Sequence, residues 1–262
     1  MAEHSAAEGH PNIVVTIDQG VQTIHMARPE KKNALTTAMY AAMVAALKDG
    51  EARDDVRVHL FKGEPGAFSA GNDIVDFLAA GEGNGLSRDV VHFLKGLATA
   101  DKPLVAAVDG LAIGIGTTML LHCDLVYASP RSLFRTPFLD LGLVPEAGSS
   151  LLAPRLMGHA RAFELLCLGE SFDATRAESA GIVNRVVADG DVESAARKAA
   201  LSLASKPRQA LSIARRLVAT GGTASRDDLM ARIDEEVALF AERLASDEAR
   251  AAFAAFLGRS KK

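Results

Sequence analysis

A buried strand, a short helical stretch and a second buried strand follow one another near the middle of the chain. This order constrains the fold more than any other feature. The first strand lies in "KPLVAAVDG" (102–110) and the second in "DLVYAS" (124–129), with "GTTMLLHC" (116–123) between them. Parallel strands need such a crossover, and crossovers of this kind are almost always right-handed. The sequence therefore predicts an α/β fold with parallel strand pairing.

The N-terminal part adds a hairpin and a helix. Residues 12–29 contain two short β-rich runs on either side of residues 18–20, a pattern typical of a β-hairpin. Apolar residues at helical spacing follow, with Thr36 or Thr37 as the expected N-cap and Gly50 at the expected C-terminal end.

After this helix, the sequence shows first the alternation of apolar and polar residues typical of a strand and then mainly helical patterns. Residues 56–63 alternate as a strand should, and residues 74–99 are helical in pattern but interrupted by "GEGNG". After one short strand in "GIVNRVV", we expect three helices near 191–204, 207–219 and 226–257, the last of which breaks in two if residues 246–247 interrupt it. We expect a core over residues 1–200 and a C-terminal helical region over 201–262.

Composition excludes several classes of protein. The chain of 262 residues has a formal net charge of -4, which argues against a nucleic-acid partner. No apolar run is long enough to span a membrane, and no cysteine or histidine spacing indicates a metal site. Cys123 and Cys167 are expected to be free thiols, and the N-terminus lacks the pattern of a signal peptide, so we expect a cytoplasmic protein.

Two loops rich in small residues are candidates for chemistry. The loop "AFSAGND" (67–73) has small residues that let a ligand approach the backbone, although a tight turn in which Asp73 caps the next helix is also consistent. The segment "DGLAIGIGTTML" (109–120) brings glycines to a helix start, where N–H groups are free. It is not a dinucleotide fingerprint, because Met119 occupies the third glycine position.

A lone carboxylate in "LGLVPEAGSS" (141–150) raises a further question. Glu146 is either a solvated acid near a helix start or a base kept out of water. A weaker alternative is a serine hydrolase built from Ser69, Asp140 or Glu146, and His159.

Together these segments resemble the crotonase, or enoyl-CoA hydratase/isomerase, superfamily. The matching segments, in family order, are "RPEKKNAL" (28–35), "AFSAGNDI" (67–74), "VAAVDGLAIGIG" (105–116), "CDLVYAS" (123–129), "FRTPFLDLGLVPEAGSS" (134–150) and "AESAGIVNRVV" (177–187). The resemblance implies a crotonase-type ββα-spiral core with a helical C-terminal trimerisation region. It also implies an acyl-CoA thioester substrate, and a homotrimer or dimer of trimers.

The resemblance also implies a site. Backbone N–H groups of Ala70 and Ile115 are expected to bind the thioester oxygen as negative charge develops on it. Coenzyme A is part of the substrate, so no separate cofactor and no metal are expected. The expected coenzyme A contacts are Lys31, Asn33, Ala34, Leu35, Ser69, Ala70, Gly71, Asn72, Asp73, Phe256 and Arg259.

The family's hydratases use two glutamates, and this chain has Thr118 and Phe138 at those positions. An isomerase branch instead uses one glutamate, which corresponds to Glu146. We therefore expect a Δ3,Δ2-enoyl-CoA isomerase in fatty acid or aromatic acyl degradation. Glu146 should sit against apolar walls drawn from Phe138, Leu141, Val144 or Leu78, which would raise its pKa. Asp73, Asp140, Asp124 and His122 are expected to be structural.

Three alternatives remain open at this stage: an enoyl-CoA hydratase, another crotonase reaction such as dienoyl-CoA isomerisation or thioester hydrolysis, and an RNA-binding crotonase relative. The RNA-binding alternative would require a lysine-rich helix face. The acyl-pocket segment near residues 75–95 cannot be interpreted from its sequence.

Overall fold

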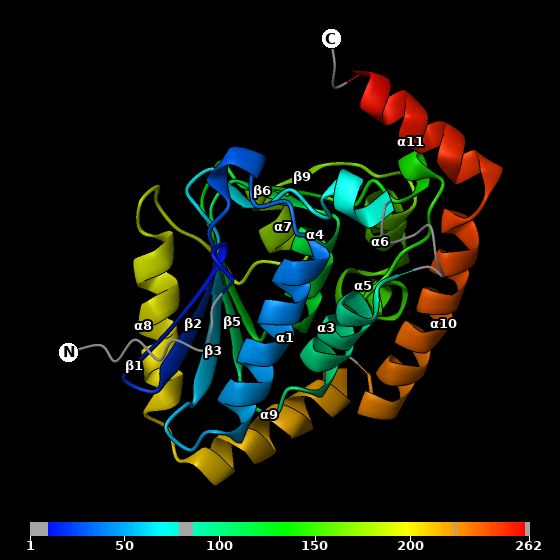
Figure 1. Cartoon of the computed structure of the whole chain (residues 1–262). Helices are drawn as coiled ribbons and strands as arrows, with labels where there is room; N and C mark the ends of the chain where they lie inside the picture. The colour runs from blue at the N-terminus through cyan, green and yellow to red at the C-terminus, as the bar shows by residue number, and fades with distance from the viewer. Residues whose placement is uncertain (1–9, 79–85, 223, 260–262) are drawn as a thin grey trace.

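A six-stranded sheet in the order β1-β2-β3-β5-β7-β10 forms the centre of the protein (Figure 1). The computed structural model describes residues 10–78, 86–222 and 224–259. The first pair is an antiparallel hairpin, and every other neighbouring pair is parallel. The strands are β1 (Ile13–Asp18), β2 (Val21–Met26), β3 (Val58–Lys62), β5 (Leu104–Val108), β7 (Leu125–Ala128) and β10 (Arg185–Val186).

Four shorter strands form a second sheet that carries the loops of interest. Its order is β4-β6-β8-β9, and β4, β6 and β8 pair in parallel. The strands are β4 (Ala67–Ser69), β6 (Leu111–Ile113), β8 (Leu133–Arg135) and β9 (Phe172–Asp173). Because β4 and β6 are parallel neighbours, the segments that follow them leave the sheet at the same edge.

Helices cover both faces of the larger sheet, as buried parallel strands require. Helices α1 and α3 pack on one face and α8 on the other (Figure 1). The helices are α1 (Thr37–Ala52), α3 (Arg88–Thr99), α4 (Ile115–Thr118), α5 (Ser149–Met157), α6 (His159–Leu166), α7 (Ala174–Ser179), α8 (Val192–Ala204), α9 (Arg208–Gly222), α10 (Arg226–Leu244) and α11 (Asp247–Arg259). Residues 74–78 are also helical. Three 3-10 turns complete the set: η1 (Pro29–Lys31), η2 (Met119–His122) and η3 (Leu139–Leu141).

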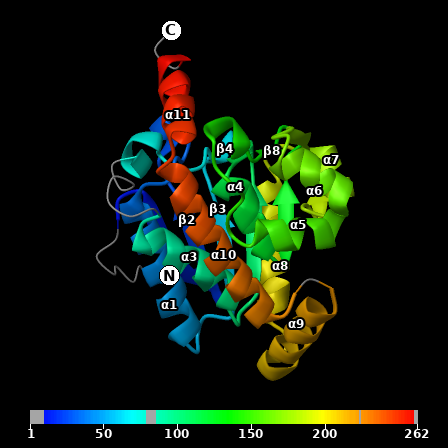
Figure 2. The same ribbon diagram turned by 90° about the vertical axis from the view of Figure 1, so that its right-hand side faces the viewer.

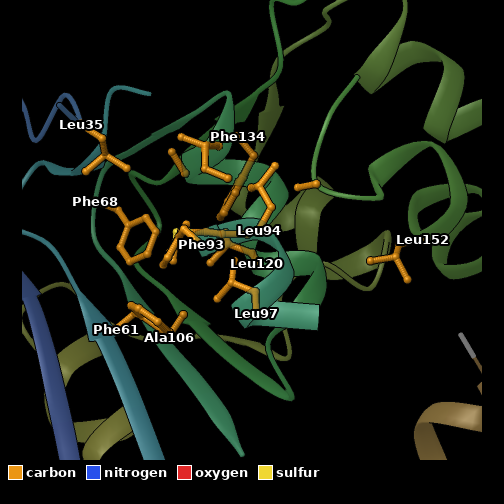
Figure 3. Packing of buried hydrophobic residues seen from close by; sticks show 14 of the residues in the cluster. Leu35, Phe61, Phe68, Phe93, Leu94, Leu97, Ala106, Leu120, Phe134 and Leu152 are labelled. Carbon is orange, nitrogen blue, oxygen red and sulfur yellow. The ribbon is translucent and has the colours of Figure 1, made fainter. Parts of the chain in front are cut away.

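The main core lies between the two sheets and helices α1 and α3. Figure 3 shows aliphatic and aromatic side chains from both sheets meeting there. Phe93 makes edge-to-face contacts with Tyr40 at 5.5 Å and with Phe61 at 6.3 Å between ring centroids. Such pairs add to the free energy gained from burial, so α1, α3 and β3 are held firmly together.

The C-terminal helices pack against this chain's own core. Phe240 of α10 and Phe253 of α11 are almost fully buried, and both rings contact Phe77. Figure 2 shows α10 crossing the molecule beside α3, with α11 extending beyond the body. The expected boundary between residues 200 and 201 falls inside α8. The trimer stays a prediction.

Several local predictions are confirmed. Gln19 and Gly20 adopt positive φ at the hairpin turn, and the Thr36 hydroxyl accepts a hydrogen bond from the Met39 N–H. The crossover strands β5 and β7 are parallel neighbours. The long C-terminal helix is broken after residue 244, which gives α10 and α11.

The prediction that Gly50 ends the first helix is wrong. The helix continues to Ala52, and Gly50 is buried inside it. A Cβ at this position would lie 2.3 Å from Gln22 Oε1 and 2.6 Å from His59 Cε1. Glycine is therefore required for close packing and does not mark the helix end. The "GEGNG" segment lies outside the described residues.

Candidate active site

Two segments that contain expected coenzyme A contacts, residues 28–35 and 67–73, are joined by hydrogen bonds. Asn33 Nδ2 donates to the Ala67 carbonyl at 2.8 Å, and Ser69 Oγ donates to the Asn33 carbonyl at 2.9 Å. The Leu35 N–H donates to the Gly71 carbonyl at 2.8 Å. Asn33, Leu35 and Ser69 are fully or almost fully buried. Their side chains therefore stabilise the loop rather than present themselves to a ligand.

Small residues let this loop touch the turn before α4. Gly71 has φ +88° and faces the Ile113 carbonyl, which a Cβ would approach to 3.0 Å. A Cβ on Gly116 would lie 2.8 Å from the Ser69 carbonyl oxygen. Larger side chains at either position would separate the two loops. The glycines therefore place the backbones of residues 69–73 and 113–116 against each other.

One of the two expected N–H donors is already engaged. The Ala70 N–H donates to the Lys32 carbonyl at 2.9 Å, so it is not free to bind a thioester oxygen. The Asn72 and Ile115 N–H groups, by contrast, have no hydrogen-bond partner within the described part of the chain. Ile115 is the first residue of α4, where helix N–H groups are free in any helix. The expectation for Ala70 thus does not fit the geometry.

Both unpartnered N–H groups belong to residues that line a cleft of about 840 Å³. Its wall is mostly apolar, and its aromatic members come from the segment after β4, from the residue that precedes η3 and from the last two helices. The aromatic lining residues are Phe77, Phe138, Phe240, Phe253 and Phe256. A cleft of this size and character suits a small organic ligand with an apolar part.

The expected coenzyme A contacts are only partly brought together. Ala70, Asn72 and Phe256 line the cleft, and Phe256 is 46% exposed. Lys31 is exposed on the neighbouring turn η1. The side chain of Arg259 lies outside the described part of the structure.

Glu146 is a buried carboxylate, 5% exposed. Thr118 Oγ1 donates a hydrogen bond to Glu146 Oε1 at 2.5 Å. Burial raises the pKa of Glu146 to about 8; the Thr118 hydrogen bond opposes this rise, and the nearby charge of Glu236 adds to it. Glu146 is not among the cleft-lining residues. Its partner Thr118, however, lies one helical turn from Ile115, which does line the cleft.

Tyr40 links Glu146 to the loop of residues 67–73. Its hydroxyl donates to Asn72 Oδ1 at 2.5 Å. Burial raises the pKa of Tyr40 well above its ordinary value, and the charge of Glu146 adds to this effect. Asn72, Tyr40, Thr118 and Glu146 therefore form one cluster, built from four separate segments of the chain.

Among the predicted walls of Glu146, Phe138 and Leu141 line the cleft. Val144 and Leu78 pack against the main core cluster. The neighbours that the hydrogen bonds and charges identify are polar, and no sequence pattern indicated Tyr40 or Glu236.

The helix-start role considered for Glu146 belongs to another residue. Helix α5 begins at Ser149 with Gly148 as its N-cap, and Gly148 has no side chain with which to cap it. Glu236 Oε2 accepts from the Gly148 N–H at 2.6 Å, and Glu236 Oε1 accepts from the Ser150 N–H at 3.0 Å. Because Glu236 satisfies these donors, the Glu146 carboxylate is not needed as a cap.

The acids expected to be structural have structural partners. Asp73 accepts from the Val75 and Asp76 N–H groups and pairs with Arg28. The other two serve similar roles: Asp124 Oδ2 accepts from the Leu104 N–H at 2.8 Å, and Asp140 pairs with Arg135 at 2.8 Å.

The serine-hydrolase alternative is contradicted. The Ser69 hydroxyl is fully buried, donates to the Asn33 carbonyl and accepts from the Gly71 N–H. His159 is exposed and its ring lies against Phe163, at 5.8 Å between centroids. Ser69 therefore lacks the histidine base that a nucleophilic serine needs.

In the part of the chain that the structure describes, no cluster of three or more metal-ligating side chains occurs. Within residues 10–78, 86–222 and 224–259, no helix has the length and hydropathy needed to cross a bilayer.

The protein has an α/β crotonase fold, and comparison with known proteins identifies its family. The model of the enoyl-CoA hydratase/isomerase family matches residues 16–262. The structure of OdaA from Pseudomonas aeruginosa is 41% identical, with a TM-score of 0.90 over 95% of this chain and 99% of that one. The chain belongs to the enoyl-CoA hydratase/isomerase family.

Relatives of similar identity carry out different reactions. Enoyl-CoA delta isomerase 2 of Rattus norvegicus is 34% identical over 98% of this chain, which spans only 66% of that protein's length. The 1,2-epoxyphenylacetyl-CoA isomerase of Escherichia coli K12 is 33% identical over 82% of this chain and 84% of its own. Family membership therefore does not by itself assign the reaction.

Proposed function

We propose that this protein is a Δ3,Δ2-enoyl-CoA isomerase in which Glu146 is the single acid–base group. The observation that carries the proposal is the environment of Glu146. It is buried, it accepts a hydrogen bond from Thr118, and its pKa is raised to about 8. A group with a pKa close to the working pH can both take up and return a proton efficiently.

The reaction needs one base and one stabilised oxyanion. Glu146 removes a proton from C2 of a 3-enoyl-CoA, and the electron pair moves onto the thioester oxygen to give an enolate. The N–H groups of Asn72 and Ile115 donate to that oxygen. Protonated Glu146 then returns the proton to C4, which leaves the double bond between C2 and C3. No water is consumed, so no second acid is required.

The replacement of both hydratase glutamates supports isomerisation over hydration. Phe138 cannot exchange a proton, and the Thr118 hydroxyl is hydrogen-bonded to Glu146 itself. Neither side chain can activate a water molecule as a carboxylate does. We therefore expect very little hydration of crotonyl-CoA.

We also propose a homotrimer or dimer of trimers, and a role in fatty acid or aromatic acyl breakdown. The exposed apolar side chains Ile213 and Val218 on α9 support association with another subunit. Light scattering on the purified protein tests this.

One panel of assays tests the reaction. Wild type and Glu146→Gln are given 3-enoyl-CoA and 2-enoyl-CoA substrates, and acyl-CoA binding is followed by calorimetry. Glu242→Gln, an exposed glutamate on α10, is the matched control. We expect isomerisation in wild type and control, a loss in Glu146→Gln of at least the 10²–10⁴-fold typical of acid–base catalysis, and unchanged binding in all three. Normal isomerisation by Glu146→Gln, or hydration as the main reaction, would refute the proposal.

A further inference from the structure

A second buried carboxylate lies directly behind the turn that carries Glu146. Glu236, on α10, is 4% exposed. It accepts three hydrogen bonds: from the Gly148 N–H at 2.6 Å, from the Ser150 N–H at 3.0 Å and from the Ser150 hydroxyl at 2.5 Å. Two of these donors are free backbone N–H groups at the start of α5, and the third is a side-chain hydroxyl. A side chain distant in sequence therefore caps this helix and binds the backbone two residues after Glu146.

The turn between Glu146 and α5 has an unfavourable backbone conformation. Ala147 has φ +60° and Gly148 has φ +68°. For alanine this left-handed conformation is sterically unfavourable, so surrounding contacts must hold it. His122 Nε2 lies 2.7 Å from the Ala147 carbonyl oxygen. Glu236 accepts from the next residue's N–H, that of Gly148, at 2.6 Å.

His122 and Glu236 are suited to these roles by their charge states. Burial lowers the pKa of His122 to about 4, so the ring is neutral at working pH and donates its Nε2–H to the carbonyl. Burial raises the pKa of Glu236, and the hydrogen bonds that both carboxylate oxygens accept at the helix N-terminus oppose this rise, because a negative charge is favoured there. Arg232, one turn earlier on α10, donates a hydrogen bond to Ser150 Oγ at 3.4 Å. Ser150 Oγ in turn donates to Glu236.

We propose that Glu236 is a positioning residue for Glu146: it fixes the left-handed turn at residues 147–148 and so fixes the direction of the Glu146 carboxylate. The inference rests on the proposed function. Glu236 does not touch the reacting atoms. It acts through the backbone of Gly148 and through its negative charge.

The charge of Glu236 gives a readout that a purely structural role would not move. The groups that face Glu146 or its turn are Tyr40 from α1, Thr118 from α4, His122 from η2 and Glu236 from α10. Of these, Glu236 supplies the negative charge that raises the pKa of Glu146 beyond the effect of burial. Removal of that charge lowers the pKa of Glu146 and moves the acid limb of the rate profile to lower pH.

The test compares Glu236→Gln with Glu242→Gln, which lies on the same helix and is exposed. We measure kcat, KM and the pH profile of isomerisation, together with thermal unfolding. In Glu236→Gln, kcat should fall by about 10²-fold, the loss expected from a misplaced catalytic group. KM should stay near the wild-type value and the acid limb should move to lower pH. The control should match wild type in all respects.

Ser150→Ala provides a second variant in case Glu236→Gln does not fold. It removes one of the three donors to Glu236 and leaves the carboxylate in place. A several-fold loss of kcat at constant KM supports the proposal, and wild-type kcat contradicts it. For Glu236→Gln, a wild-type kcat and pH profile overturns the proposal. If Glu146→Gln is inactive in the same series, the proposed function survives that failure. If Glu146→Gln is active, the proposed function itself fails.

Discussion

At alkaline pH, the free energy of unfolding of Glu146→Gln should be higher than that of wild type. Burial raises the pKa of Glu146 to about 8, from an ordinary value of 4.5. The folded state therefore binds more protons than the unfolded state between these two pH values, and wild-type stability falls as pH rises through the window. Each unit of difference corresponds to about 1.4 kcal/mol. The cost of ionising Glu146 in the folded protein is thus about 5 kcal/mol above pH 8.

Glutamine has nearly the same shape, can still accept from the Thr118 hydroxyl and cannot ionise. The difference in unfolding free energy between Glu146→Gln and wild type should be small near pH 4.5, increase up to about pH 8 and then level off. Urea unfolding followed by circular dichroism, at one protein concentration across this pH range, measures it. Glu242→Gln should give a flat difference. A flat difference for Glu146→Gln would show that Glu146 ionises normally, and the reasoning would then be wrong.

Three further predictions concern groups around Glu146. Thr118→Val removes the hydrogen bond that lowers the pKa of Glu146, so the acid limb of kcat/KM should move to higher pH, while Thr118→Ser should keep the wild-type profile. Ile115→Pro removes one proposed oxyanion donor at a helix position that tolerates proline. It should lower kcat by about 10²–10³-fold, whereas Ile115→Val should retain most activity. Gly148→Ala forces alanine into φ +68° and brings its Cβ to 2.4 Å from Leu229 Cδ1. Chemical denaturation should show a loss of about 1–3 kcal/mol.

The larger sheet was predictable because its signals are local and long enough to interpret. Strands β5 and β7 have four or five residues each and enclose a helical segment, so both strand type and parallel pairing follow from the chain order. The second sheet was harder to predict from the sequence. Strands β6, β8 and β9 have only two or three residues, which is too short for an alternating pattern to differ from chance.

The identity of the proposed oxyanion donors could not be predicted from residue type. Every residue except proline carries the same N–H, so Ala70 and Asn72 are equivalent at the level of sequence. Only the hydrogen bond from the Ala70 N–H to the Lys32 carbonyl distinguishes them. Lys32 itself has positive φ, a conformation that no sequence pattern in this segment indicated.

Two buried carboxylates that lie close together repel each other when both are charged. The different hydrogen-bond partners of Glu146 and Glu236 explain how the fold accommodates both. Burial raises the pKa of Glu236, but three hydrogen-bond donors and a helix N-terminus oppose that rise and favour its charged form. Glu146 has a single hydroxyl donor, from Thr118. When one proton is available to the pair, Glu146 should therefore be the group that binds it. The same asymmetry suits the proposed reaction, because the carboxylate that caps the helix keeps its charge while the other remains free to exchange a proton with the substrate.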